Sequence, residues 1–228
     1  MRMCLFLSLQ PRPGASVSVG EVAAIDGVLR AVPHLARALV HTAARAHDPF
    51  LDDGPPPPLV LQLYFAELPE LEAALAPRGR LSALSSPELF PGLAGAEIVQ
   101  QAMLARSFAV SEPQTAPADA TCTYLVSYEG DAEDLNAWLG HYLAAHTRHM
   151  ADLPGIRELE VYTRLDWVSG LDWPRATCMQ RNKVVFDTPD ALTAALNSPI
   201  RQKMRADYQT FPAFTGANTH YAMTSRRL

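Results

Sequence analysis

The chain has 228 residues, of which 48% are hydrophobic and 19% are charged, and its formal net charge at pH 7 is −5. These values are typical of a globular protein and argue against a surface built to bind nucleic acid or an anionic membrane, so we expect neither partner. The three cysteines (Cys4, Cys122 and Cys178) form no CxxC pair, which is typical of a reducing compartment. We therefore expect a cytoplasmic location.

The sequence repeats itself with an offset of 121 positions. Segment 32–42 matches segment 153–163 in its apolar, proline and threonine positions. Phe90-Pro91 recurs at the same offset as Phe211-Pro212. A fixed period of this length predicts two copies of one structural unit.

We expect repeat 1 over residues 1–110, a linker over 111–120 and repeat 2 over 121–228. The linker is rich in proline, alanine, serine and threonine and has no hydrophobic periodicity. Where matched positions differ in polarity, one copy is expected to have kept a function that the other lost. Repeat 1 is the more apolar copy, so we expect it to be a scaffold and repeat 2 to carry the site.

Each copy is predicted to run strand, helix, strand, strand, helix, strand. Repeat 1 has a short first helix and four prolines at 55–58 before its third strand. In repeat 2, the first strand is predicted over Thr123–Tyr128, and Asp131 is a plausible N-cap for the first helix. One buried face of that helix is predicted from apolar residues at helical spacing, which are Leu135, Trp138, Leu139, Tyr142 and Leu143. The remaining elements of repeat 2 are predicted as strands over 156–164, 178–186 and 219–225, a loop over 165–177, and helical turns that follow Thr188-Pro189 and Ser198-Pro199.

The βαββαβ order predicts an antiparallel four-stranded sheet with both helices on one face, the ferredoxin-like plan. Such a sheet leaves its other face uncovered, and a second copy can cover it. We therefore expect an α+β fold in which two tandem ferredoxin-like domains pack sheet to sheet as an intramolecular dimeric α/β barrel.

Several short motifs of repeat 2 occur in a characteristic order. They are the helix residues Trp138, Tyr142 and His146, the turn Leu153-Pro154-Gly155-Ile156-Arg157, Phe186-Asp187, and Phe211-Pro212. In order and spacing they resemble the EthD family of the dimeric α/β-barrel superfamily. The family often has a proline two residues after the helix histidine, where this chain has Arg148.

The resemblance implies a dimeric or pseudo-dimeric barrel, and a homodimer of such chains is possible. Relatives in the wider superfamily include cofactor-free isomerases, polyketide cyclases, dehydratases, quinone-forming monooxygenases and haem enzymes.

His146 continues the apolar stripe of its helix, at a position where repeat 1 has Ile25. It is either a buried structural histidine bonded to the backbone or a general acid or base, and we favour the second interpretation. His141 and His149 lie nearby and raise the question of a metal site. On a regular helix His141 lies about 140° around the axis from His146, so the two cannot share a ligand face. No carboxylate stands at ligand spacing, so we expect no metal site and a solvated His141.

Alternation along the strands of repeat 2 places one set of polar residues on the face away from the helices. The predicted barrel-facing residues are Glu160, Tyr162, Arg181, Lys183, Asn218 and His220. At positions matched to Glu160, Tyr162, Arg181 and His220, repeat 1 has Leu39, His41, Val60 and Val99. This pattern predicts a polar cavity in repeat 2. A structural ion-pair cluster of Glu160 with Arg181 or Lys183 is the alternative.

We predict a cofactor-independent lyase or isomerase that acts on a small aromatic or aromatic-derived metabolite. His146 would transfer a proton, with Tyr162 and Glu160 orienting the substrate or the base, while Arg181 or Lys183 would hold a carboxylate or phenolate. The predicted substrate site is completed by Tyr142, Trp167, Trp173, Asn218 and His220.

Three alternatives stay open. The chain could be a cofactor-free monooxygenase of a phenolic substrate, a non-catalytic binding or accessory protein in which His146 is structural, or a protein that binds haem or a metal. Trp167 and Trp173 could equally anchor the loop that carries them. The sequence has no GxGxxG, P-loop, GxSxG or HExxH motif, which argues against a dinucleotide cofactor, phosphoryl transfer and a serine hydrolase.

Overall fold

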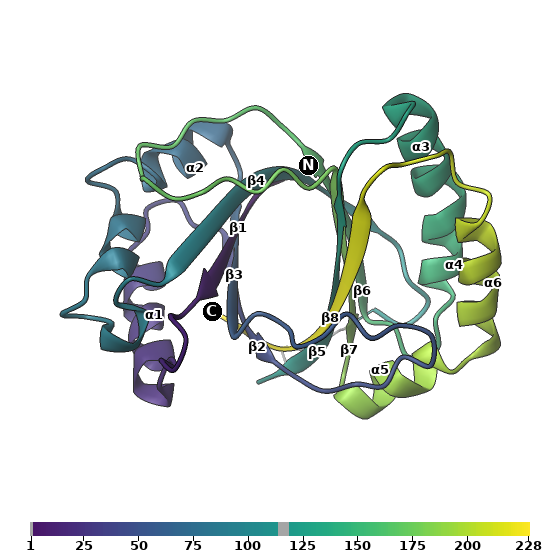
Figure 1. Ribbon diagram of the computed structural model, residues 1–228, viewed down its shortest axis with the longest axis horizontal. Helices are drawn as coiled ribbons and strands as arrows, with labels where there is room; N and C mark the ends of the chain where they lie inside the picture. Colours follow the sequence, from purple (N-terminus) through teal and green to yellow (C-terminus); the bar gives the residue numbers. More distant parts are fainter. Residues whose placement is uncertain (1, 114–118) are drawn as a thin grey trace.

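The computed structural model describes residues 2–113 and 119–228, so the centre of the predicted linker, 114–118, lies outside the described residues. Within those ranges, eight antiparallel strands close into a barrel in the order β1-β3-β2-β8-β5-β7-β6-β4 (Figure 1). The strands are β1 (Arg2–Gln10), β2 (Arg37–Ala43), β3 (Leu59–Phe65), β4 (Glu97–Phe108), β5 (Thr121–Glu129), β6 (Glu158–Arg164), β7 (Gln180–Phe186) and β8 (Ala217–Arg227). The predicted α+β barrel is confirmed.

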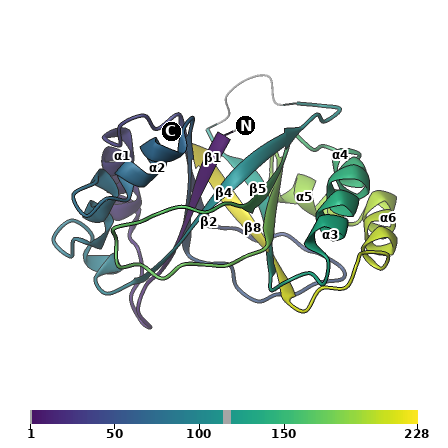
Figure 2. The ribbon, with the colours of Figure 1, turned by 90° about the horizontal axis from the view of Figure 1, so that it is seen from above.

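Two layers of helices cover opposite sides of the barrel, as the perpendicular views in Figures 1 and 2 show. One layer consists of α1 (Val19–Arg30), α2 (Leu68–Ala74) and the 3-10 turns η1 (Arg80–Ser85) and η2 (Pro91–Leu93). The other consists of α3 (Leu135–His141), the π-helix η3 (Tyr142–His146), α4 (Thr147–Ala151), α5 (Pro189–Leu196) and α6 (Pro199–Tyr208). None of the described helices is long and apolar enough to cross a membrane.

Local sequence signals explain where the helices begin. Ser18 caps α1, since its hydroxyl accepts from the backbone N–H of Glu21 and the Glu21 carboxylate accepts from the backbone N–H of Ser18. Thr188 caps α5 through its side chain, which accepts from the backbone N–H of Ala191, and Pro189 stands at the first helical position as predicted.

The barrel closes because the two halves pair at their edges. β1 to β4 form one four-stranded sheet and β5 to β8 form the other, with β2 hydrogen-bonded to β8 and β4 to β6. The sheets are therefore joined edge to edge around an interior and do not stack as two separate layers. Closure pairs both edges of each of these eight strands, which removes the aggregation hazard of an open sheet.

The pairing of the last strand differs from the 121-residue offset that the sequence suggested. Leu5 of β1 pairs with Ala102, whereas Val126, 121 positions after Leu5, pairs with His220. His220 therefore corresponds to Ala102, 118 positions earlier, and not to Val99. A shift by an odd number of residues turns every side chain of the strand to the opposite face.

The prediction that Asn218 and His220 face the barrel interior was wrong for this reason. Both side chains face the helices of the second half, where they line a cavity. Met223 belongs to the cluster of side chains inside the barrel, and Tyr221 packs against that cluster.

Two long loops are exchanged between the halves (Figure 1). The loop over 44–58 leaves β2 and reaches the second half, where Asp48 pairs with Arg201. The loop over 165–177 leaves β6 and reaches the first half, where the Trp173 indole N–H donates to Ser85. Each half is thus covered by a segment of the other.

Candidate functional site

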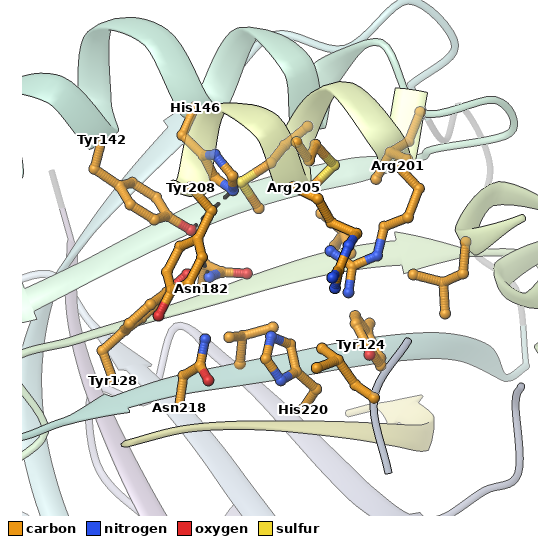
Figure 3. Close-up of a pocket in the computed structure, with 17 residues that line it drawn as sticks. Tyr124, Tyr128, Tyr142, His146, Asn182, Arg201, Arg205, Tyr208, Asn218 and His220 are labelled. Atoms are coloured by element: carbon orange, nitrogen blue, oxygen red, sulfur yellow. Dashed lines mark hydrogen bonds between the residues drawn. The ribbon is translucent and has the colours of Figure 1, made fainter. Parts of the chain in front are cut away.

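The candidate site is a cavity between the second-half sheet and its helices, and it lies outside the barrel (Figure 3). Its volume is about 110 Å³. That is similar in scale to the roughly 150 Å³ apolar cavity known to bind benzene. Its apolar wall is formed by Val126, Met150, Leu153, Val184, Leu196 and Met204, and its aromatic wall by Tyr124, Tyr128, Tyr142 and Tyr208. The lining therefore suits one small aromatic ring.

His146 enters this cavity from the π-helix η3 and is 4% exposed. Its Nδ1 lies 2.7 Å from Asp207 Oδ2 on α6. A carboxylate can only accept at that distance, so we assign the ring proton to Nδ1. Nε2 then carries the lone pair. Nε2 has no hydrogen-bond partner among residues 2–113 and 119–228. Because this atom is not fully buried, it opens on the cavity that His146 lines.

The charge state of this pair suits a base at neutral pH. Burial lowers the pKa of His146 to about 4, although the hydrogen bond to Asp207 acts in the opposite direction. Burial alone would raise the pKa of Asp207, but the hydrogen bonds from His146 and His141 lower it below its ordinary value. At pH 7 the imidazole is therefore neutral and the carboxylate ionised.

The prediction that His141 is solvated and turned away from His146 was wrong. His141 Nε2 lies 2.9 Å from Asp207 Oδ1, so one carboxylate joins both histidines. The cause is the π-helix between them, whose i to i+5 hydrogen bonds widen the turn and align residues five apart. In the described part of the chain, no group of three or more His, Cys, Asp or Glu residues is arranged to hold a metal ion.

His220 faces the same cavity from β8 on the opposite wall (Figure 3). Its Nδ1 lies 2.8 Å from Asp53 Oδ2, and its backbone N–H donates to the same oxygen. Burial lowers the pKa of His220, partly offset by Asp53. Asp53 belongs to the loop over 44–58, so both halves of the chain contribute to the site.

Two arginines of α6 lie at one end of the cavity. Arg201 is neutralised by Asp48 at 2.7 Å, and the same carboxylate accepts from the Tyr124 hydroxyl. Arg205 lies 4.3 Å over the Phe50 ring and forms no ion pair with any described residue. A positive charge without a matched carboxylate therefore remains at this end of the cavity.

Asn182 supplies a further polar group from β7. Its amide N–H donates to the Tyr142 hydroxyl at 2.7 Å, whereas its Oδ1 is buried and contacts no partner among the residues described. Leaving a buried acceptor unmet costs roughly 1–3 kcal/mol. Tyr142 and Asn182 both line the cavity, and the sequence analysis missed Asn182.

Glu160, Tyr162 and Lys183 lie on the other face of the sheet, inside the barrel, where they are at most 1% exposed. Lys183 Nζ is 3.2 Å from Glu160 Oε2, and the Tyr162 hydroxyl donates to that oxygen at 2.6 Å. Gln62 and Tyr64 of the first half complete the network. Burial would raise the pKa of Glu160, but Lys183 holds it below its ordinary value. The barrel-facing prediction for these three was correct, but the sheet separates them from His146.

Arg181 lies at the barrel mouth, beside a second cavity of about 420 Å³. Its guanidinium stands 5.1 Å over the Phe6 ring and donates to Gln101.

Trp167 and Trp173 pack against the core of the first half, on the far side of the barrel from the His146 cavity. Of the ten residues predicted for the site, the structure brings together His146, Tyr142, Asn218 and His220 in one cavity.

Asp207, Asp53, Asn182, Arg201 and Arg205 were missed. The two arginines stand four apart on a helix that begins at Pro199, so their shared face was a readable signal. The two aspartates are 61 and 167 positions from their histidines, and no sequence pattern links such pairs.

No protein-family model and no curated protein matches this sequence. Among solved structures, an anthrone oxidase-like protein matches at 13% identity and a TM-score of 0.61, over 99% of this chain and 92% of that one. A proposed monooxygenase from Fusobacterium nucleatum matches at 6% identity and a TM-score of 0.60, over 99% and 92%. A mutant of chlorite dismutase from Candidatus Nitrospira defluvii matches at 12% identity and a TM-score of 0.54, over 97% and 90%. At these identities the likeness shows the fold alone, and the chain shares the α/β-barrel fold of these proteins.

Proposed function

We propose that this chain is a cofactor-independent lyase or isomerase that transfers a proton on a small aromatic or aromatic-derived substrate. The observation that carries the proposal is His146, whose Nδ1 is fixed on Asp207 and whose Nε2 opens on a cavity of aromatic and apolar side chains. A histidine held in one tautomer by a carboxylate is the usual form of a general base.

In the proposed reaction, His146 Nε2 removes a proton from a carbon of the bound substrate and returns it to a different carbon in an isomerisation, or to the leaving group whose bond breaks in an elimination. The Asp207 carboxylate across Nδ1–H stabilises the imidazolium that forms in between. Arg205, whose charge is matched by no carboxylate of the described residues, would hold the negative charge that develops on the substrate, or a carboxylate or phenolate already present. We assign Glu160, Tyr162 and Lys183 to a structural network, since they are sealed inside the barrel.

The test begins with a screen of small phenols and aromatic acids by thermal shift, because specific binding to the native state raises the melting temperature. Hits are then followed in D₂O by NMR, which detects both conversion and exchange of substrate protons. His146→Asn keeps a donor near Nδ1 for Asp207 and removes Nε2. We expect this variant to lose turnover and proton exchange by a factor of about 10²–10⁴.

His34→Asn is the matched control. His34 lies in the first half with a positive φ of 59°, a conformation that asparagine tolerates well. We expect its activity to equal that of the wild type. Undiminished turnover by folded His146→Asn would refute the proposed base.

A cofactor-free monooxygenase of a phenolic substrate is the second candidate. It is favoured by the names of two structural neighbours, an anthrone oxidase-like protein and a proposed monooxygenase. A phenolate formed by His146 would then react with O₂. Stoichiometric oxygen uptake during conversion of a screened substrate would support this candidate, and conversion under nitrogen would support the lyase or isomerase.

We further propose that the two halves are tandem ferredoxin-like domains with the boundaries predicted above, and that the second is EthD-like. The βαββαβ order of each half and the burial of Trp138, Tyr142 and His146 on one helical face support this assignment. Association of two chains into a homodimer stays a prediction.

A further inference from the structure

Two hydrogen-bond acceptors that open on the cavity lack a donor within the described part of the chain. They are Nε2 of His146 and Nε2 of His220. In both histidines Nδ1 is committed to an aspartate, so Nε2 can only accept while the ring is neutral. Oδ1 of Asn182 also lacks a donor, but it is sealed between its neighbours and does not open on the cavity.

These acceptors come from different walls of the cavity. His146 projects from the helices, whereas His220 projects from the strands beneath them (Figure 3). A ligand between the walls can therefore meet acceptors on two sides of its ring. The charged groups around His220 are Asp53, Asp48 and Arg201, with the Tyr124 ring centred 5.7 Å away.

Unmet acceptors in an apolar cavity determine what a ligand must offer. Buried polar groups in folded proteins are nearly always hydrogen-bonded, so a ligand that fits this cavity supplies donors to them. An aromatic ring meets the apolar wall, and hydroxyl groups are the donors that such a ring most simply carries. A ring with one hydroxyl would satisfy one histidine and leave the other unmet.

We propose that the cavity takes a small aromatic compound with at least two hydroxyl groups, and that His220, positioned by Asp53, accepts one of them on the wall opposite His146. The inference rests on the proposed function, in that it takes this cavity as the substrate site. It makes His220 the second substrate-binding histidine and gives the loop over 44–58 a role in specificity.

Calorimetric titration tests the proposal with catechol, resorcinol and hydroquinone, each compared with its own monomethyl ether, at pH 7 without oxygen. The ether keeps the ring and one hydroxyl and loses one donor. A hydrogen bond contributes roughly 0.5–1.5 kcal/mol net, so we expect the best-fitting diphenol to bind about two- to thirteenfold more tightly than its ether.

His220→Asn keeps a donor near Nδ1 for Asp53 and removes Nε2. We expect it to reduce the diphenol-to-ether affinity ratio to about one, while His34→Asn keeps the wild-type ratio. In wild-type protein, nitrogen NMR of the imidazole rings is expected to show both Nε2 resonances shifting when the diphenol binds. That measurement does not depend on the folding of any variant.

A wild-type ratio of one, an absence of diphenol binding, or an unchanged ratio in folded His220→Asn would overturn the inference. Failure of the proposed function has a different signature. In that case the diphenol preference would remain, but His146→Asn would leave turnover and proton exchange unchanged.

Discussion

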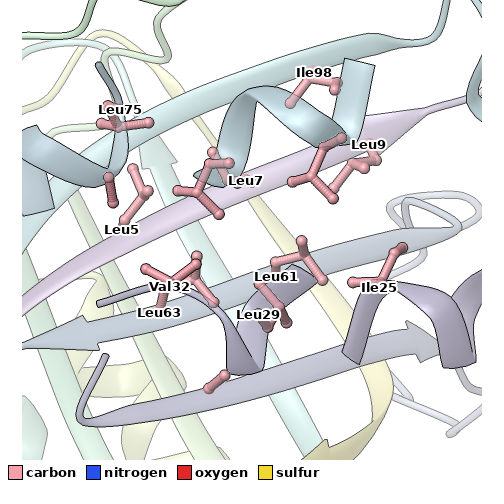
Figure 4. Close-up of a cluster of buried hydrophobic side chains, with 14 of the residues drawn as sticks. Leu5, Leu7, Leu9, Ile25, Leu29, Val32, Leu61, Leu63, Leu75 and Ile98 are labelled. Carbon is pink, nitrogen blue, oxygen red and sulfur yellow. The ribbon is translucent and has the colours of Figure 1, made fainter. Parts of the chain in front are cut away.

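The helix-facing positions of the two half-barrels are filled by different kinds of residue. In the first half, leucine and isoleucine side chains from β1, β3 and α1 interlock in one continuous core (Figure 4). In the second half, three of the matched positions carry polar side chains around a cavity. The matched pairs are Leu7 and Tyr128, Leu61 and Asn182, and Ile25 and His146.

The exchanged loops extend this difference. The loop over 165–177 packs Trp167, Leu171 and Trp173 against the apolar core of the first half. The loop over 44–58 brings Asp48 and Asp53 to the second half, where they pair with Arg201 and His220. One half is thus covered by apolar side chains and the other by carboxylates that orient polar groups. The same backbone plan supports a packed layer and a functional layer, and side-chain polarity decides between them.

The largest expected effect compares two equivalent leucines. Leu75 is buried in the first-half core, and Leu196, 121 positions later, lines the cavity. Leu75→Ala is expected to cost about 2–5 kcal/mol, since it empties a well-packed site. Leu196→Ala is expected to cost less, because it enlarges a space that already exists. Urea denaturation measures both, and equal losses would contradict the contrast between the layers.

The next effect is the loss of stability in acid. Burial lowers the pKa of His146 to about 4, whereas an unfolded histidine titrates near 6.5. Between those values the unfolded chain binds a proton that the folded chain does not, so the free energy of unfolding falls as pH falls. The contribution of His146 is complete above pH 6.5 and is lost by about pH 4, and it amounts to about 3 kcal/mol.

Denaturation at a series of pH values measures how steeply the free energy of unfolding changes with pH. His146→Asn should flatten the curve in the window between pH 6.5 and 4, because it removes one titrating group. In that variant, the free energy of unfolding should still fall somewhat as pH falls, because His41 is buried inside the barrel and its pKa is lowered to about 3. A variant as acid-sensitive as the wild type would show that His146 does not titrate as described.

The smallest expected effect concerns the loop over 165–177. Trp173→Phe keeps an aromatic ring on the first-half core and removes the indole donor to Ser85. We expect a loss of at most about 1 kcal/mol, since the hydrogen bond is partly exposed. Ser85→Ala should give the same loss. Diphenol affinity should not change in either variant. A weakened affinity would indicate that Trp173 is part of the substrate site after all.

Much of the architecture was predictable because it depends on local periodicity. The βαββαβ order follows from the alternating spacing of apolar residues in strands and their helical spacing in helices. The orientation of Glu160, Tyr162 and Lys183 toward the barrel interior follows from the two-residue period of side chains along a strand. His146 was identifiable because a histidine replaced Ile25 on an otherwise apolar stripe. These inferences need only the residues of one element and its repeated counterpart.

The composition of the site was decided by the tertiary structure. The slip in register that turns His220 toward the helices depends on which residues of β5 and β8 pair, and periodicity within a strand does not specify its partner. The π-helix that aligns His141 with His146 is a local departure from the spacing on which the prediction relied.

By itself, the sequence determined an α+β barrel and a buried histidine in its second half, because hydrophobic spacing reports which face of an element is buried. Only the tertiary structure decided which side of the sheet holds the cavity and which carboxylates orient its histidines. Asp53 and Asp207 reach His220 and His146 through an exchanged loop and a separate helix. Contacts between segments so distant in the chain arise from chain folding and leave no periodic trace in the sequence.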